Sequence, residues 1–217
     1  MPLMRAARRL IVPSVIKALT LLLGAPAIAQ DAPIDSQPDS PTVEELTTEA
    51  NEARQTRSTR AMGVLLGWSA LNVGVGTVGY FTTDGSTRYF HQMNAAWNLV
   101  NAAIAGIGLT RSRSTDPAQF TPLETVEEDY RLQKVLLFNM GLNVAYMAGG
   151  AYLWERGLRT DDERLRGYGP SIVAQGGFLL LFDSTFFWLQ NRSASDYRRQ
   201  LSLHWQDGPG LSVYGRF

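Results

Sequence analysis

The chain contains 217 residues, of which 45% are hydrophobic and 18% are charged, and it has no cysteine. The absence of cysteine excludes a disulfide scaffold, a cysteine-ligated metal and thiol catalysis. Because 20 basic residues balance 20 acidic residues, the chain lacks the positive field that nucleic-acid binding requires, so we expect no nucleic-acid partner.

Residues 1–29 have the features of a secretory signal peptide. A leader with four basic residues precedes an apolar run over residues 18–24, and Ala27-Ile28-Ala29 supplies the small-x-small pattern of a cleavage site. We predict cleavage after Ala29, with an uncleaved membrane anchor as the alternative. Residues 30–53 are then an acidic, partly disordered exported segment, because their prolines and carboxylates disfavour a buried core. From about Pro41 the pattern becomes helical.

Four apolar stretches predict membrane-spanning helices within residues 54–191. Each is about as long as the hydrocarbon core of a bilayer is thick, and they cover residues 61–81, 93–109, 135–154 and 171–189. The predicted fold class is all-α, a four-helix transmembrane bundle built from two helical hairpins. The alternative is a soluble four-helix bundle, which would show a strongly charged outer face that these stretches lack.

Sequence signals for helix starts and turns place the predicted boundaries. Thr121-Pro122-Leu123-Glu124 has the form of a capping box with proline at the first helical position, so the third helix is expected to run from there to Gly157. Asp84-Gly85-Ser86 predicts a tight turn between the first two helices. Gly169-Pro170 is expected to open the fourth helix, and the acidic residues 161–163 are expected to be solvated loop charge.

The signal peptide also sets the predicted orientation of the chain. If it is cleaved, both ends of the mature protein face the exterior of a bacterial inner membrane that the chain crosses several times. The arginines oppose this orientation, because the segments assigned to the exterior carry more of them than the two interior loops. The prediction follows the signal peptide.

An internal repeat relates the first and third predicted helices. At a constant offset of 71 residues, Leu71-Asn72-Val73 matches Leu142-Asn143-Val144, and Gly79 matches Gly150. Such a repeat indicates two parallel hairpins related by an axis along the membrane normal.

A polar stripe follows one face of the second predicted helix. Its members recur at spacings of three and four residues, which places them on one helix face, and amides in lipid must point into the bundle to find partners. The stripe consists of His91, Asn94, Asn98 and Asn101. Polar residues of the other helices are expected to complete the polar intramembrane core, namely Asn72, Asn139, Asn143, Gln175 and Asp183.

Two interpretations of this polar core stay open. In the first, interhelical hydrogen bonds of about 0.5–2 kcal/mol each fix which helices meet. Glycine-rich faces such as Gly63-xxx-Gly67 agree with that interpretation and with a homodimer. In the second, the core is a small polar cavity for a solute, a proton or a headgroup. Asp183 favours the second, because a carboxylate in mid-span is costly unless it is protonated or hydrogen-bonded.

The sequence gives little indication of an enzyme. His91 and His204 are expected on opposite sides of the membrane, which argues against a haem or a histidine-rich metal site. Neither a nucleophile–base pair nor a phosphate-binding loop or dinucleotide fingerprint occurs in the sequence. We therefore expect no catalytic residues, no bound metal and no cofactor. An intramembrane acid–base enzyme using His91 or Asp183 is the third alternative for the function.

The exported tail, residues 192–217, is predicted to contain a short C-terminal β-hairpin. Residues 201–205 and 211–217 alternate between apolar and polar on either side of a turn sequence at 206–210. Two strands cannot close an outer-membrane barrel. We expect the hairpin to pack on the rim of the bundle or to dock a partner, because a lone hairpin is only marginally stable.

Distinctive motifs lie between residues 79 and 178. They are Gly79-Tyr-Phe81, Tyr89-Phe-His-Gln-Met-Asn-Ala-Ala-Trp-Asn-Leu-Val-Asn101, Leu153-Trp-Glu-Arg-Gly157, Arg166-Gly-Tyr-Gly169 and Gln175-Gly-Gly-Phe178. Over about residues 55–190 the chain resembles an uncharacterised bacterial family of small multi-helix membrane proteins of unknown function. The resemblance implies the architecture and supplies no mechanism.

These observations predict a non-enzymatic integral membrane protein of the bacterial envelope with a structural or protein-interaction role. Its expected partners are membrane lipid and either a second copy of the chain or another envelope protein. The alternative is a small-solute or proton-coupled transporter that uses the polar stripe. An essential Asp183 in an intact fold would favour the transporter or the enzyme, and a tolerated Asp183→Asn substitution would favour the structural role.

Overall fold

The structure is a computed structural model, which describes residues 41–207. In this range the chain forms four long α-helices and one short 3₁₀ helix, and it contains no strand. The elements are α2 (Val43–Thr82), α3 (Gly85–Ser114), η1 (Pro117–Gln119), α4 (Pro122–Thr160) and α5 (Glu163–Asp207). The predicted all-α fold is confirmed. The predicted signal peptide at residues 1–29 lies outside the described residues.

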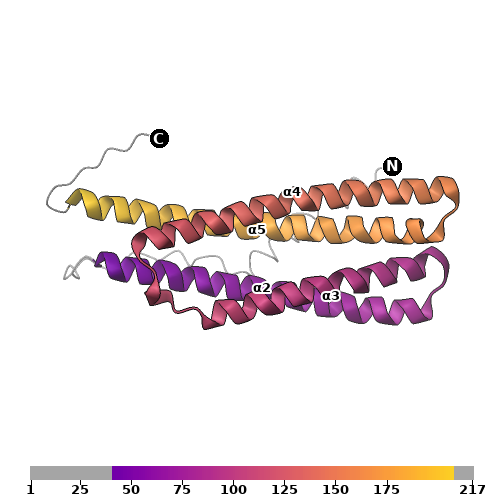
Figure 1. The fold of residues 1–217 in the computed structure, drawn as a ribbon, viewed down its shortest axis with the longest axis horizontal. Helices are drawn as coiled ribbons and strands as arrows, with labels where there is room; N and C mark the ends of the chain where they lie inside the picture. The colour runs from indigo at the N-terminus through magenta and orange to yellow at the C-terminus, as the bar shows by residue number, and fades with distance from the viewer. Residues whose placement is uncertain (1–40, 208–217) are drawn as a thin grey trace, which may run out of the picture.

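The helices form two antiparallel hairpins, α2–α3 and α4–α5, that lie side by side in one elongated bundle (Figure 1). Helix α5 packs against each of the other three long helices, whereas α3 and α4 have no Cα atoms within 8 Å of each other in the part of the chain described. The first and last described residues lie at the same end of the bundle (Figure 1). The two predicted hairpins are therefore confirmed.

A capping box begins the first helix of each hairpin. The Thr42 side chain accepts a hydrogen bond from the Glu45 N–H at 3.2 Å, and the Glu45 carboxylate accepts one from the Thr42 N–H at 2.8 Å. Thr121 and Glu124 repeat this arrangement at the start of α4. Each carboxylate satisfies a backbone donor that has no partner within the helix. These bonds hold the pKa of Glu45 and of Glu124 below the ordinary value.

The tight turn predicted between the first two helices is also confirmed. Helix α2 ends at Thr82, the Thr83 N–H donates to the Gly79 carbonyl at 3.0 Å, and α3 begins at Gly85. Gly85 has φ +58°, a left-handed conformation that glycine adopts without steric cost.

The predicted start of the fourth helix at Gly169-Pro170 is wrong. Helix α4 ends in a left-handed Asp161, and α5 begins at Glu163 with Pro170 inside it. The Asp162 carboxylate accepts hydrogen bonds from the N–H groups of Arg164 at 2.9 Å and Leu165 at 3.2 Å. Asp162 is thus a helix cap rather than solvated loop charge, and it starts α5 before the proline is reached.

The first strand of the predicted C-terminal β-hairpin is also wrong. Residues 201–205 belong to α5, which continues to Asp207. Extending an existing helix fixes one residue for each hydrogen bond gained, whereas a hairpin must be nucleated anew. Five alternating residues are too short a pattern to reverse that preference. The second predicted strand, residues 211–217, lies outside the described range.

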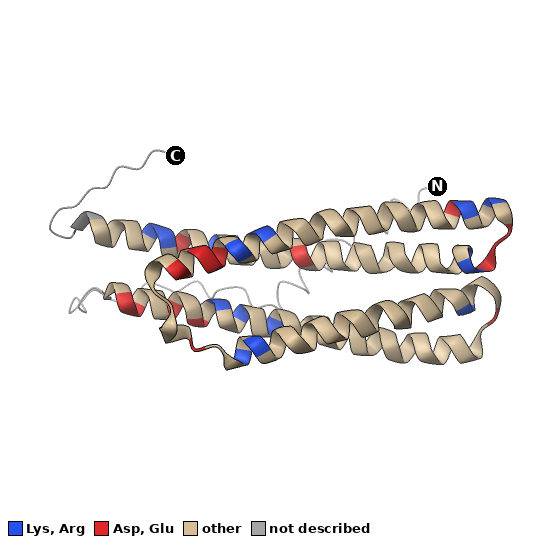
Figure 2. Ribbon diagram, viewed as in Figure 1, with Lys and Arg blue, Asp and Glu red and all other residues tan. Residues whose placement is uncertain are grey.

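Charge separates the bundle into two regions along its axis. Residues 61–83, 89–110, 135–154 and 167–191 contain no Lys, Arg or Glu and one Asp, Asp183, and we call them the charge-poor slab. Interhelical packing sets them at one level, since Gly79 faces His91 across α2 and α3 and Gly150 faces Gly169 across α4 and α5. Gly167 of α5 faces Tyr89 of α3, which aligns the two hairpins. Residues 43–60, 111–134 and 192–207 form the charged end, and more charges lie at the opposite tips of the hairpins (Figure 2).

Two of the described helices, α2 and α5, are long and apolar enough to cross a membrane, where four were predicted. Helices α3 and α4 fall short because asparagines within their apolar stretches lower the mean hydropathy. All four stretches predicted to span are nevertheless helical throughout. In the predicted repeat, Leu65 and Leu136 are both buried, and Gly79 and Gly150 each pack on the second helix of their own hairpin. The duplication itself stays a prediction.

Candidate functional site

Three helices meet at a hydrogen-bonded group of amides within the charge-poor slab. The Gln175 Nε2 on α5 donates to the Asn94 Oδ1 on α3 and, at 3.4 Å, to the Asn72 Oδ1 on α2. The Asn94 Nδ2 donates to the Asn72 carbonyl at 3.3 Å, which connects α3 to α2 directly. Gln175 is 2% exposed and Asn94 4% exposed. The structure therefore brings together Asn72, Asn94 and Gln175 of the predicted polar core.

A separate polar pair joins the helices of the second hairpin. The Asn143 Nδ2 on α4 donates to the Asp183 Oδ2 on α5 at 2.7 Å, and both side chains are buried. No basic side chain of the described residues forms a salt bridge with Asp183. The pair thus places one carboxylate in the apolar part of the bundle with an amide as its hydrogen-bond donor.

The remaining predicted members of the polar core form no hydrogen bond with the side chains of the amide group or of the Asp183 pair. Asn98 is fully buried and Asn101 is 6% exposed, yet the Asn98 Oδ1 and the Asn101 Nδ2 have no hydrogen-bond partner among the described residues. His91 packs on Gly79, and its buried Nδ1 also lacks a partner there. Asn139 is half-buried and joins neither the amide group nor the Asp183 pair.

Trp68 is a member of the amide group that the sequence analysis missed. Its Nε1 donates to the Gln175 Oε1 at 3.1 Å, and its ring stacks on Phe178 at 3.8 Å between centroids. The signal in the sequence was its spacing of four residues from Asn72, which places both on one face of α2. A tryptophan in an apolar stretch gave no reason to assign it to a polar group rather than to the core.

The charge-poor slab buries polar side chains beside an apolar cluster that includes Leu65, Leu136 and Phe182, and its exposed large side chains are mostly apolar. Asn94, Asn98 and Gln175 lie inside, whereas large apolar side chains cover its outer surface. The exposed set includes Leu71, Val75, Val78, Phe81, Leu99, Val100, Ile104, Ile107, Leu137, Phe138 and Val144. A soluble bundle shows the opposite distribution along its helices. The surface of the slab is suited to an apolar surrounding.

A different polar cluster holds the charged end together. The Arg54 guanidinium on α2 forms an ion pair with the Asp129 carboxylate on α4 at 3.2 Å, and it also donates to the Thr125 carbonyl at 3.1 Å. The Asn51 Nδ2 donates to the Thr125 hydroxyl at 3.0 Å. The Arg54 and Asp129 side chains are only 12% and 10% exposed. The first helices of the two hairpins are thereby joined by a buried ion pair.

Burial controls the protonation of the acid in this pair. The pKa of the Asp129 carboxyl lies above its ordinary value, because the loss of hydration outweighs the attraction of the Arg54 guanidinium. Arg57, which donates to the Gln190 side chain, has a pKa below its ordinary value for the same reason. The charged end thus also buries ionisable groups, and it gives Asp129 a partner of opposite charge and Arg57 a neutral amide acceptor.

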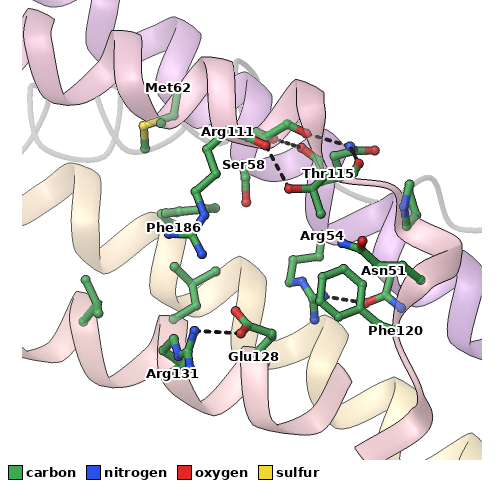
Figure 3. Close-up of a pocket in the computed structure, with 17 residues that line it drawn as sticks. Asn51, Arg54, Ser58, Met62, Arg111, Thr115, Phe120, Glu128, Arg131 and Phe186 are labelled. Atoms are coloured by element: carbon green, nitrogen blue, oxygen red, sulfur yellow. Dashed lines mark hydrogen bonds and ion pairs between the residues drawn. The ribbon is translucent and has the colours of Figure 1, made fainter. Parts of the chain in front are cut away.

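A cavity of about 520 Å³, which Arg54 of this ion pair helps to line, opens at the charged end (Figure 3). It lies between α2, the end of α3, η1 and the first part of α4, with Phe186 of α5 at its inner side. Arginines from three helices line it: Arg54, Arg111 and Arg131. No local pattern in the sequence indicates this pocket, because its lining residues come from segments of the chain as far apart as Asn51 and Phe186.

The described residues contain no group of three or more His, Asp or Glu side chains positioned to hold a metal ion. The arrangement offers amide hydrogen bonding, two buried carboxylates, Asp129 and Asp183, and an arginine-lined pocket.

Comparison with known protein families matches residues 64–184 to a family of unknown function, DUF6992. The match covers more than half of the 217 residues, and the chain belongs to this family. The matched range lies within the residues over which the motifs indicated an uncharacterised family. Neither the curated proteins nor the solved structures contain a match to the chain.

Proposed function

We propose that this DUF6992 protein is a non-enzymatic integral membrane protein of the bacterial envelope, with a structural or protein-interaction role. The observation that carries the proposal is the outer surface of the charge-poor slab, where large apolar side chains are exposed while amides are buried inside beside an apolar cluster. Its shortest stretch, residues 135–154, is about 30 Å long at 1.5 Å per residue, which equals the hydrocarbon thickness of a bilayer.

The distribution of charge supports four crossings rather than two. The slab includes a stretch from each of the four long helices, and charges lie beyond it at both ends (Figure 2). Although asparagines lower the hydropathy of α3 and α4, those asparagines that are buried do not meet lipid. We therefore propose a multi-pass protein of the inner membrane, with both ends of the mature chain on the exterior side.

Membrane fractionation tests this location. The full chain, expressed in a bacterium, should stay in the membrane pellet after extraction with alkaline carbonate and should be released by detergent. A peripheral inner-membrane protein serves as the control for the extraction. Release of the chain into the carbonate supernatant would overturn the membrane location and restore the soluble-bundle alternative.

Close packing and hydrogen bonds between the helices inside the slab support the structural role. A side chain on Gly150 or Gly169 would collide with backbone of the opposite helix, so α4 and α5 approach as closely as glycine permits. The amide group formed by Asn72, Asn94 and Gln175 fixes the position of α2 and α3 relative to α5. Close packing and interhelical hydrogen bonds are the two interactions that hold helices together in lipid.

The interaction role is supported by glycines that face outward. Gly63, Gly67 and Gly74 on α2 have no atom within 4 Å of where a side chain would begin. They leave a shallow apolar face on which the helix of a second copy can pack closely. We propose a homodimer through this face.

Cysteine crosslinking tests the homodimer, since the chain has no cysteine of its own. Gly67→Cys should form an intermolecular disulfide in membranes treated with an oxidant. Leu99→Cys, which is exposed on α3, is the matched control and should not. Equal crosslinking at both positions, or none at Gly67→Cys, would contradict this interface.

A transporter remains the second candidate because of two observations. Buried amide atoms of Asn98 and Asn101 lack partners, and Asp183 lies in the slab without a basic partner among the described residues. Internal water would satisfy such atoms. Single cysteines at Asn98, Asn101 and Asp183 distinguish the candidates when a small membrane-impermeant thiol reagent is added to intact cells. Labelling would indicate a water-filled path and favour transport, and protection alongside a labelled loop cysteine would favour a dry structural core.

A further inference from the structure

The arginine-lined pocket lies across the border between the charge-poor slab and the charged end. Met62, Val135 and Phe186, which line it, belong to the slab, whereas Arg54, Arg111 and Arg131 lie just beyond the slab. Under the proposed membrane location this border is the level of the lipid headgroups. The pocket therefore has an apolar inner part facing the hydrocarbon side and a basic outer part facing the headgroup side.

The connection between the hairpins keeps the pocket open. Gln55 on α2 donates to the carbonyls of Ser112 and Thr115, both at 2.6 Å, which fixes the end of α3 against α2. Helix α4 then starts after Thr121, and no Cα atom of α4 lies within 8 Å of a Cα atom of α3, so the space between Arg111 on α3 and Arg131 on α4 stays unfilled. Figure 3 shows Arg111 extending into this space from α3 and Arg131 lying across from it.

Of the three arginines that line the pocket, two form a salt bridge and one carries a positive charge that no salt bridge among residues 41–205 neutralises. Asp129 neutralises Arg54 at 3.2 Å, and Glu128 neutralises Arg131 at 2.9 Å. Arg111 forms no salt bridge with any acidic group of residues 41–205. Arg111 is exposed, and the neighbouring Ser58 also lines the cavity, whereas the Ser112 hydroxyl already donates to the Gln55 carbonyl at 3.2 Å. An arginine with an adjacent hydroxyl can bind a phosphate group through charge-assisted hydrogen bonds.

We propose that this pocket binds an anionic phospholipid. The phosphate would pair with Arg111, and an acyl chain would lie along Met62, Leu132 and Val135 on the inner side. A volume of about 520 Å³ suits a headgroup with the first part of an acyl chain better than a bare inorganic anion, and basic pockets between membrane helices bind anionic headgroups in this way. The inference rests on the proposed membrane location and adds a specific lipid site to it.

Native mass spectrometry of the full chain in detergent tests the proposal. Phosphatidylglycerol and phosphatidylcholine with identical acyl chains are offered in mixed micelles, and the retained lipid is counted. The wild type should retain phosphatidylglycerol about fivefold more than phosphatidylcholine, and Arg111→Gln should remove that preference, since one arginine near a membrane surface has about that effect. Arg113→Gln is the matched control, because Arg113 is exposed two residues away and does not line the pocket.

Each contrary outcome has a distinct meaning. Equal retention of the two lipids by the wild type, or an unchanged preference in Arg111→Gln, would overturn the lipid site while leaving the membrane location intact. Arg111-dependent binding of inorganic phosphate as tight as that of phosphatidylglycerol would make the pocket a small-anion site and would also overturn the proposal. Release of the chain by carbonate would instead remove the membrane location itself. Circular dichroism of both variants shows whether the helices are intact.

Discussion

The charge-poor slab and the charged end both bury polar side chains, but they expose different kinds of side chain to their surroundings. Inside the slab, amides of Asn72, Asn94 and Gln175 bond to one another, and leucines, valines and phenylalanines face outward. Inside the charged end, Arg54 pairs with Asp129, and charged side chains cover the surface. A continuous helix such as α2 passes through both regions. The buried side of each region thus determines which helices meet, while the exposed side distinguishes the slab from the charged end.

The buried ion pair gives the largest expected effect at the charged end. Asp129→Ala leaves the Arg54 guanidinium buried without its carboxylate, which should lower the free energy of unfolding by about 3 kcal/mol or more. Thermal or denaturant unfolding in detergent measures the loss. The control is Glu128→Ala, which removes the surface pair with Arg131 and should cost about 1 kcal/mol or less. The double variant Arg54→Met, Asp129→Leu should be more stable than Asp129→Ala alone, and a less stable double variant would show that the ion pair is not the cause.

The exposed surfaces of the two regions offer a matched pair of leucines. Leu71 in the slab is 61% exposed, and Leu123 at the charged end is 69% exposed. If the slab lies in lipid, Leu71→Arg should disfavour insertion by about 2.5–3.5 kcal/mol, whereas Leu123→Arg should be neutral in water. The amount of each variant in the membrane fraction measures the difference. Equal amounts would show that both surfaces face the same solvent.

Alanine substitutions at two adjacent glycines of α4 test the packing inside the slab, and they give the smallest expected change in the free energy of unfolding. A Cβ at Gly150 would lie 2.8 Å from the Gly169 carbonyl oxygen, whereas a Cβ at Gly149 would meet no atom within 4 Å. Gly150→Ala should therefore destabilise the bundle by about 1–3 kcal/mol, and Gly149→Ala should stabilise the helix by up to about 1 kcal/mol. Unfolding of the two variants in the same detergent gives both values. Similar changes at both positions would mean that α4 and α5 are not in close contact there.

Local signals in the sequence were sufficient for most of the fold. The Thr121–Glu124 capping box and the turn at Gly85 were predicted because their hydrogen bonds and dihedral angles involve neighbouring residues. The start of α5 was missed although its signal was also local, since Asp162 was interpreted as solvated charge and Pro170 as a helix start. The strand at residues 201–205 was wrong because short alternation does not outweigh a helix that is already formed.

The polar core was predicted as a set, but its pairing was not. Spacing on one helix face identified Asn94, Asn98 and Asn101 as buried, because helical periodicity is a property of the chain itself. Which of them bonds to Gln175, and that Asp183 bonds to Asn143 instead, depends on the axial position at which the helices pack. That position is set by close contacts such as Gly176 against Met147, which no spacing along one helix reveals.

The existence of four helices, their order in two hairpins and the buried faces of the asparagine-bearing helices followed from local patterns in the sequence. The Arg54–Asp129 pair and the pocket with Arg111 depend instead on how the two hairpins pack. The physical reason is the range of the interactions. Helix periodicity and capping act over three to four residues, whereas these features join side chains brought together only when whole hairpins pack.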